Sequence, residues 1–178
     1  MMSEKHIQTP LTAETVRSLN AGDEVRITGV IYTARDAAHK KLCELLDAGQ
    51  PLPFDPEGQI IYYTGPTPPP PGRPIGSCGP TTSYRMDRYT PPLLERGLKG
   101  LIGKGRRGQA VIDSIRDNTA VYFSAEGGCG ALLANYVKAC EVVAFPELGT
   151  EAVHKLTVEN FPVSVFCDCG GNIYSPYL

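Results

Sequence analysis

The sequence predicts a layered α/β domain, because strand-like and helix-like segments alternate along it. Residues 24–32 alternate between apolar and polar side chains and are rich in β-branched residues, which predicts a strand. Residues 33–49 follow with an apolar stripe at helical spacing, with Thr33 as the expected N-cap and Gly49 as the expected end. After residue 98 the chain alternates strand, helix, strand, helix and strand, which is typical of βαβ units in a layered sheet.

The remaining elements can be placed in chain order. Residues 59–65 predict a strand that opens into an extended proline-rich loop and then into a segment without clear periodicity. Thr90 is expected to cap a short helix that has Pro91 in its first position. Further strands are expected at 99–103, 119–125, 141–145 and 162–169, helices at 108–117 and 129–139, and a short amphipathic stretch near 150–156.

Length and composition indicate one ordered domain. The 178 residues are 42% hydrophobic and 20% charged, which argues against global disorder. Residues 1–22 are predicted to be a polar lead-in that wraps another surface, such as a partner subunit, and residues 23–178 to be a single catalytic domain. The net charge of −2 gives no support for binding nucleic acid or an acidic membrane, so an anion site must come from a local group of cations.

The sequence favours a cytoplasmic location. The first residues contain no apolar core of the kind that a signal peptide needs, and no apolar run approaches the roughly 18 residues of a membrane helix. None of the six cysteines forms a C-x-x-C pair, so reduced and mostly buried thiols are expected.

A glycine-rich turn raises the question of nucleotide binding. Gly103, Gly105 and Gly108 form a G-x-G-x-x-G pattern between a predicted strand and a predicted helix, and Glu126 follows at the end of the next strand. This pattern leaves open an NAD(P)-binding oxidoreductase domain. The turn begins about 100 residues into the chain, however, which leaves too little sequence for a complete dinucleotide-binding domain.

The same turn is unusually cationic. Lysine near a helix N-terminus is unfavourable unless an anion is bound there, so Lys104 and the helix N–H groups predict a small-anion site. Arg106 and Arg107 are expected to be solvated charges, and the role of Arg88 is left open.

Residues 77–91, SCGPTTSYRMDRYTP, combine five serine and threonine hydroxyls with two arginines and a Gly-Pro turn. Alone, such a segment is typical of a self-capping loop. Together with TGVIYTARDAAHKK upstream, GLIGKG and GGCGALLA downstream and a closing DCGGNIY, it resembles the β-type catalytic domain of iron–sulfur hydro-lyases, the class I fumarases and L-tartrate dehydratases. The resemblance extends from about residue 8 to residue 175.

The resemblance implies a fold, a partner and a cofactor. It implies a swivelling β/β/α domain, with a layered mixed sheet and flanking helices, that is either the C-terminal part of a long chain or a separate small subunit. It further implies a partner α subunit whose three thiolates hold a [4Fe–4S] cluster, so no cofactor or metal ligand is expected in this chain. Homo-oligomeric contacts are expected as well.

The resemblance also implies which residues form the site. Arg35, Arg85 and Lys104 match the family's substrate-binding cations, and Lys104 is expected to act in catalysis as well. Thr82 matches a hydrogen-bond donor to the substrate, and Thr81 matches the group considered to move the proton. A threonine hydroxyl is a poor base unless a neighbouring group activates it, so an orienting role for Thr81 stays open.

Other polar residues have simpler expected roles. His39 is expected to be an exposed or hydrogen-bonded helix residue, and Asp36 to pair with a cation of the same loop. Cys167 and Cys169 are expected to be ordinary strand residues that hold no metal. Cys78 and Cys129 flank glycine-rich turns and are expected near the site without acting as ligands.

The function that these observations predict is reversible hydration of a C4 dicarboxylate, with fumarate/malate as the first expected substrate and tartrate as the next. Arginine suits bidentate carboxylate binding, and lysine adds a point charge where negative charge develops. Two alternatives stay open, the NAD(P)-binding domain and a non-catalytic module that binds a dicarboxylate in the same pocket. Neither the substrate nor the oligomeric state follows from the sequence.

Overall fold

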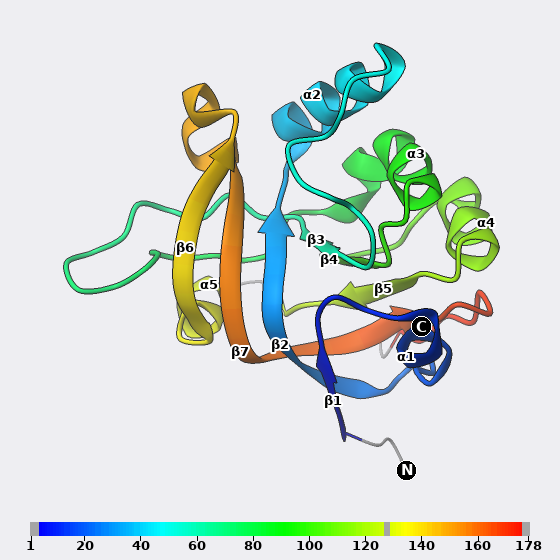
Figure 1. The fold of residues 1–178 in the computed structure, drawn as a ribbon. Helices are drawn as coiled ribbons and strands as arrows, with labels where there is room; N and C mark the ends of the chain where they lie inside the picture. The colour runs from blue at the N-terminus through cyan, green and yellow to red at the C-terminus, as the bar shows by residue number, and fades with distance from the viewer. Residues whose placement is uncertain (1–3, 127–128, 176–178) are drawn as a thin grey trace.

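A computed structural model describes residues 4–126 and 129–175. Its strands are β1 (Glu4–Gln8), β2 (Glu24–Thr33), β3 (Ile60–Tyr62), β4 (Gly100–Gly103), β5 (Val121–Ser124), β6 (Val137–Ala144) and β7 (Val153–Cys167). Its α-helices are α1 (Ala13–Arg17), α2 (Asp36–Asp47), α3 (Thr90–Glu95), α4 (Gln109–Asp117) and α5 (Gly130–Ala134), joined by the 3-10 helices η1 (Ser83–Tyr89) and η2 (Pro146–Glu151). Figure 1 shows these elements around one mixed sheet, which confirms the predicted α/β class.

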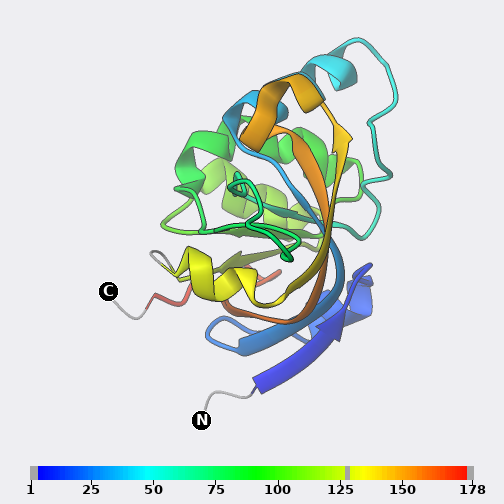
Figure 2. The same cartoon turned by 90° about the vertical axis from the view of Figure 1, so that its left-hand side faces the viewer.

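The sheet has the strand order β1-β2-β3-β4-β5-β7-β6. The pairs β1–β2, β2–β3, β3–β4 and β4–β5 are parallel. Strand β7 is antiparallel to each of its partners β2, β5 and β6. Because β7 pairs with both β2 and β5, the strands β2, β3, β4, β5 and β7 close into a ring. The long, curved β7 that makes this closure is visible in Figures 1 and 2.

Two hydrophobic clusters lie on the two faces of β3, β4 and β5. One contains Tyr62, Ile102 and Phe123 and packs inside the ring against β2 and β7. The other contains Tyr63, Leu101 and Tyr122 and is covered by α2, α3 and α4, which Figure 1 shows on the same side of the molecule. Since β2 to β5 are parallel neighbours, their carboxyl ends lie along one edge.

Residues 4–22 pack against the chain's own sheet. Strand β1 pairs with β2, and the side chain of Thr12 accepts the N–H of Thr15 at 3.1 Å to cap α1. Ile7 and Val16 are buried in the cluster inside the ring. The sequence of residues 1–22 predicted only a polar lead-in, without β1 or α1. That these residues wrap a partner stays a prediction.

Both predicted threonine caps are wrong. Helix α2 begins at Asp36 with Arg35 at the N-cap, because the Thr33 hydroxyl instead contacts His154 Nδ1 at 3.3 Å and accepts the His154 N–H at 3.1 Å. Helix α3 begins at Thr90 itself, whose hydroxyl donates back to the Met86 carbonyl at 2.9 Å.

The helix predicted over 129–139 is only partly present. Helix α5 ends at Ala134, and β6 begins at Val137 in register with Val158 of β7. Pairing with β7 overrides the local helical pattern, because strand preference depends on neighbouring strands. The stretches expected at 150–156 and 162–169 both contribute to the single 15-residue strand β7.

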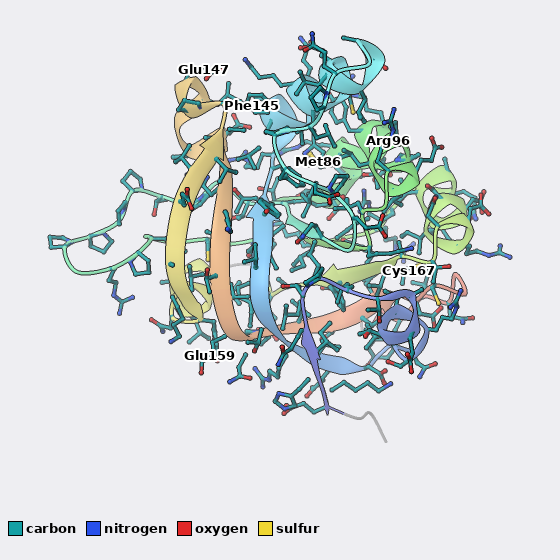
Figure 3. The ribbon with its side chains drawn as sticks, viewed as in Figure 1. Met86, Arg96, Phe145, Glu147, Glu159 and Cys167 are labelled. Atoms are coloured by element: carbon teal, nitrogen blue, oxygen red, sulfur yellow. The ribbon has the colours of Figure 1, made fainter. Side chains whose placement is uncertain are left out.

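The β6–β7 hairpin reaches helix α2. Figure 3 labels Phe145 and Glu147 at the tip of this hairpin. The Nζ atom of Lys41 in α2 lies 2.7 Å from Glu147 Oε1 and 5.3 Å from the centre of the Phe145 ring. No helix within residues 4–126 and 129–175 is long and apolar enough to cross a membrane.

Candidate functional site

The predicted site residues lie along the carboxyl edge of the parallel strands. Arg35 stands two residues after the end of β2, and Lys104 follows β4 directly. Thr81 reaches the same edge because its N–H donates to the carbonyl of Tyr63, just after β3, at 2.7 Å. The fold therefore brings residues from three separate sequence motifs to one edge of the sheet.

The segment that carries Thr82 is attached to Lys104 by main-chain pairing. Thr82 and Lys104 form an isolated parallel bridge, and the N–H of Ser83 donates to the Lys104 carbonyl at 2.9 Å. The Ser83 hydroxyl accepts the Lys104 N–H at 3.0 Å and lies 2.8 Å from the Tyr122 hydroxyl. These bonds fix the main chain of Lys104 at the end of β4.

The two predicted arginines share a hollow of about 430 Å³, whose lining also includes Asp36 and Arg88. Arg85 Nη2 donates to Asp36 Oδ2 at 3.2 Å, and both side chains are well exposed. Arg35 makes no ion pair with any residue that the structure describes, and its Nε is buried without a hydrogen-bond partner. Asp36 does pair with a cation, but the prediction of a cation from the same loop is wrong, because the partner is Arg85 of η1.

Lys104 lines a different hollow, of about 550 Å³, together with Arg106, Ser124, Glu126 and Ser164. Within residues 4–126 and 129–175, its ammonium group has no hydrogen-bond or ion-pair partner. The structure therefore gathers the predicted residues at one edge but not in one pocket.

Contacts and backbone conformation within the chain explain the glycines of the G-x-G-x-x-G turn. A Cβ at Gly103 would lie 2.0 Å from Ser83 Oγ, and Gly105 has a φ of +85°. The N–H of Gly108 donates to Asp87 Oδ2 at 2.7 Å, so a carboxylate of the same chain already occupies the beginning of α4. This contact argues against an external anion or a pyrophosphate at the Gly108 N–H, and the binding of a small anion by Lys104 stays a prediction.

Arg107 is buried, contrary to the prediction of a solvated charge. Its side chain is 1% exposed, its Nε donates to Asp87 Oδ1 at 2.6 Å, and its Nη2 donates to Thr90 Oγ1 at 2.9 Å. The guanidinium carbon lies 5.1 Å from the ring centre of Tyr63 and 4.9 Å from that of Tyr122. Burial opposes the charge, but Tyr63 and Asp87 outweigh burial and raise the pKa of Arg107. Arg107 is thus a structural cation.

A protein-family model described as the fumarase C-terminus matches residues 2–176. The chain belongs to this family. The match confirms the resemblance to the iron–sulfur hydro-lyases that the GPTTSYRMD and TARDAAH segments indicate.

Three curated relatives are similar to the chain. The chain is 45% identical over 148 residues to the anaerobic class I fumarate hydratase of Escherichia coli, covering 82% of the chain and 27% of that relative. It is 41% identical over 160 residues to fumarate hydratase 2 of Leishmania major, covering 88% of the chain and 28% of that relative. It is 42% identical over 172 residues to a Methanocaldococcus jannaschii protein assigned as L(+)-tartrate dehydratase subunit beta, covering 91% and 86%. The chain therefore spans about a quarter of the fumarate hydratases and most of the tartrate dehydratase subunit.

The two buried cysteines of the chain, Cys78 and Cys167, are poorly suited to bind a metal. Burial raises the pKa of Cys78 to about 12 and that of Cys167 to about 11, which disfavours the thiolate form that binds metal. Among the described residues, no group of three or more histidine, cysteine and acidic side chains is placed to hold a metal ion. Cys129 lies at the N-cap of α5, and its Sγ is 3.8 Å from Glu126 Oε2. Gly127 and Gly128 of the GGCGALLA segment lie outside the described residues.

Two residues that shape the candidate site were not predicted from the sequence. Ser83 connects the loop to β4 and β5, and Asp87 joins Arg107 to the beginning of α4. Both stand within the GPTTSYRMD segment, but their partners lie at least 20 residues downstream. Only the glycine at position 103, which the Ser83 side chain requires, hinted at this contact.

Proposed function

We propose that the chain is the β subunit of a hydro-lyase that reversibly hydrates a C4 dicarboxylate, with fumarate/malate as the first expected substrate and tartrate as the next. The observation that carries the proposal is a set of cations at one sheet edge that the described residues leave available. Arg35 and Lys104 have no acidic partner among those residues, whereas the neighbouring Arg107 is neutralised by Asp87. The names of the E. coli, L. major and M. jannaschii relatives support the two substrates.

The cations suit the chemistry of a dicarboxylate. Arg35 and Arg85 can each bind a carboxylate with two parallel N–H donors, which fixes the orientation of the substrate. Lys104 adds a positive charge where the carboxylate beside the developing carbanion becomes more negative. Removal or addition of a proton at that carbon is thereby favoured.

Arg85 is available despite its ion pair with Asp36. Both side chains of the pair are 42% exposed, and an exposed ion pair contributes roughly 0–1 kcal/mol. A substrate carboxylate can therefore replace Asp36 at little cost.

The two threonines have different roles in the proposal. The main chain of Thr81 is fixed by Tyr63, and that of Thr82 by the bridge to Lys104. Thr82 donates a hydrogen bond to the substrate, and Thr81 moves the proton. Because a free threonine hydroxyl is a poor base, we assign its activation to a group of the partner subunit.

We assign the [4Fe–4S] cluster to that partner, an α subunit. In support, Cys78 and Cys167 are buried, and no cysteine among the described residues belongs to a group that could hold a metal ion. We also propose that copies of this chain contact one another in the assembled enzyme. The six free thiols support a reducing, cytoplasmic location.

Co-expression tests the proposal. The chain is produced without oxygen, alone and together with the cluster-bearing protein that its own genome encodes, and each preparation is assayed with malate and both enantiomers of tartrate. We expect a colourless, inactive chain alone and a brown, oxygen-sensitive hydro-lyase from the pair. Full activity of the chain alone, or a brown complex that converts none of the three substrates, would contradict the proposal.

A further inference from the structure

The first turn of α2 contains a buried histidine, His39, that is hydrogen-bonded to the proposed substrate-binding residue Arg35. His39 is completely buried and stands one helical turn after Arg35. The Arg35 carbonyl accepts two hydrogen bonds from this residue, one from the His39 N–H at 2.9 Å and one from the ring Nδ1 at 2.8 Å. The sequence-based prediction of a hydrogen-bonded helix histidine is thus confirmed, with a specific partner.

The geometry fixes the tautomer of the ring. A carbonyl oxygen can only accept, so Nδ1 must carry the proton. Burial lowers the pKa of His39 to about 4, so the ring is neutral near pH 7 and Nε2 carries no proton. Nε2 is buried and has no hydrogen-bond partner among residues 4–126 and 129–175.

The charged and titratable groups around the ring come from several elements. Asp36 is on the same helix, Tyr63 follows β3 with its ring 5.4 Å away, and Tyr89 of η1 stacks at 5.9 Å. Arg107 faces the ring from the segment before α4 and disfavours a second positive charge. This position therefore suits a neutral donor and would not tolerate a cation.

The side chain of Arg35 is confined in a second way. It passes over Gly65, where a Cβ would lie 3.1 Å from Arg35 Cδ and 3.3 Å from Nη1. Its Nε is buried. The main chain of Arg35 is therefore held by His39, and its side chain is directed by the close approach to Gly65.

We propose that His39 is a positioning residue, whose Nδ1–H holds the Arg35 carbonyl and thereby orients the Arg35 guanidinium toward a substrate carboxylate. The inference rests on the proposed function of Arg35 and adds a residue that does not touch the substrate. A role in packing alone would require only the volume of the ring.

Two substitutions of nearly equal shape separate positioning from packing. His39→Asn places an amide nitrogen near the position of Nδ1 and can still donate to the Arg35 carbonyl, whereas His39→Leu cannot. In the assembled enzyme we expect His39→Leu to raise KM for the dicarboxylate about tenfold, with a smaller change in kcat, in line with the loss of one buried hydrogen bond. His39→Asn should stay within about threefold of the wild type. Equal KM values for the two variants would overturn the proposal.

A second measurement on the full chain does not depend on activity. In a long-range ¹H–¹⁵N NMR spectrum near pH 7, His39 should show the Nδ1–H tautomer, and the Nε–H signal of Arg35 should be protected from solvent exchange. We expect that protection to be lost in His39→Leu and retained in His39→Asn. An Nε2–H tautomer, or equal protection in both variants, would refute the role of His39.

The two arms distinguish the possible failures. If the wild-type complex has no hydro-lyase activity, the proposed function fails, and the NMR comparison alone decides whether His39 orients Arg35. If the complex is active and KM does not separate Asn from Leu, the proposed function stands and the role of His39 fails.

Discussion

Lys104 and Arg107 stand three residues apart in one cationic turn, yet the protein neutralises only Arg107. The difference arises from Asp87, which is distant in sequence and meets Arg107 only when η1 packs beside the start of α4. Charge pattern alone could not distinguish the two residues, because each of them is a cation beside a glycine. The resemblance of GLIGKG to a known family is what identified Lys104 as the functional one.

The Asp87–Arg107 pair should matter for stability. Asp87→Asn leaves a buried guanidinium without its counterion, so we expect the free energy of unfolding to fall by about 3–5 kcal/mol. Urea denaturation of the full chain measures this change, with Asp113→Asn on the exposed face of α4 as the control. A loss as small as that of the control would show that the pair contributes little.

His39 should make stability depend on pH. The pKa is about 4 in the folded protein and about 6.5 in the unfolded chain, so between these values the unfolded chain holds a proton that the folded one lacks. Stability from this group is therefore complete above about pH 6.5 and is lost as the pH falls toward 4. Urea denaturation at pH 7 and pH 5 should show a larger loss in the wild type than in His39→Asn, and parallel losses would contradict this account.

At the scale of elements, the turn between β4 and α4 connects the fold to the site. Gly103 lets Ser83 pack against β4, and Gly105 takes a backbone conformation that L-residues rarely adopt. The Ser83 contact in turn holds Lys104 at the sheet edge. A pattern that resembles a nucleotide-binding loop is explained here by loop packing.

The two glycines should respond differently to alanine. In Gly103→Ala the new Cβ displaces Ser83, so we expect a loss of about 1–3 kcal/mol of stability and a clear loss of activity. In Gly105→Ala the new Cβ meets open space, so the cost should be the roughly 1–2 kcal/mol of a left-handed backbone, with activity largely retained. Thermal unfolding and kcat/KM of both variants test this, and equal activity losses would argue against a specific role of the Ser83 contact.

The elements that the sequence predicted best are those with a strong periodic pattern. Helix α4 and strand β2 lie close to their expected ranges, because each buries one face against the same domain. The helix expected beyond Ala134 and the cap expected at Thr33 failed for a common reason. Residues beyond Ala134 form β6, which pairs with β7, and the Thr33 hydroxyl at the end of β2 accepts the N–H of His154 of β7. No local sequence pattern reveals these contacts with β7.

At the scale of the whole molecule, the closed ring of strands determines where the site can form. Strand β7 pairs with both β2 and β5 and closes the ring, and the parallel pairing of β2 to β5 places the carboxyl ends of these four strands at one edge. The sequence predicted that Arg35, the threonine loop and Lys104 act together, but not the pairings of β2 with β3 and of β3 with β4 that make their strands neighbours, which join residues such as Tyr32 with Ile61 and Ile60 with Gly100. The division of the cations between two hollows could not be predicted at all, since it depends on how the loop crosses the edge.

The central claim is that Lys104 binds the substrate, whereas Arg106, which lines the same hollow, does not. Lys104→Ala and Arg106→Ala each remove one cation from the same hollow, and neither cation has an ion-pair partner among the described residues. We expect kcat/KM of the assembled enzyme for malate, or for the tartrate it converts, to fall by about 100-fold or more in Lys104→Ala and by less than about threefold in Arg106→Ala, with unfolding temperatures close to the wild type in both. Similar small losses in the two variants would contradict the assignment of the site to this edge of the sheet.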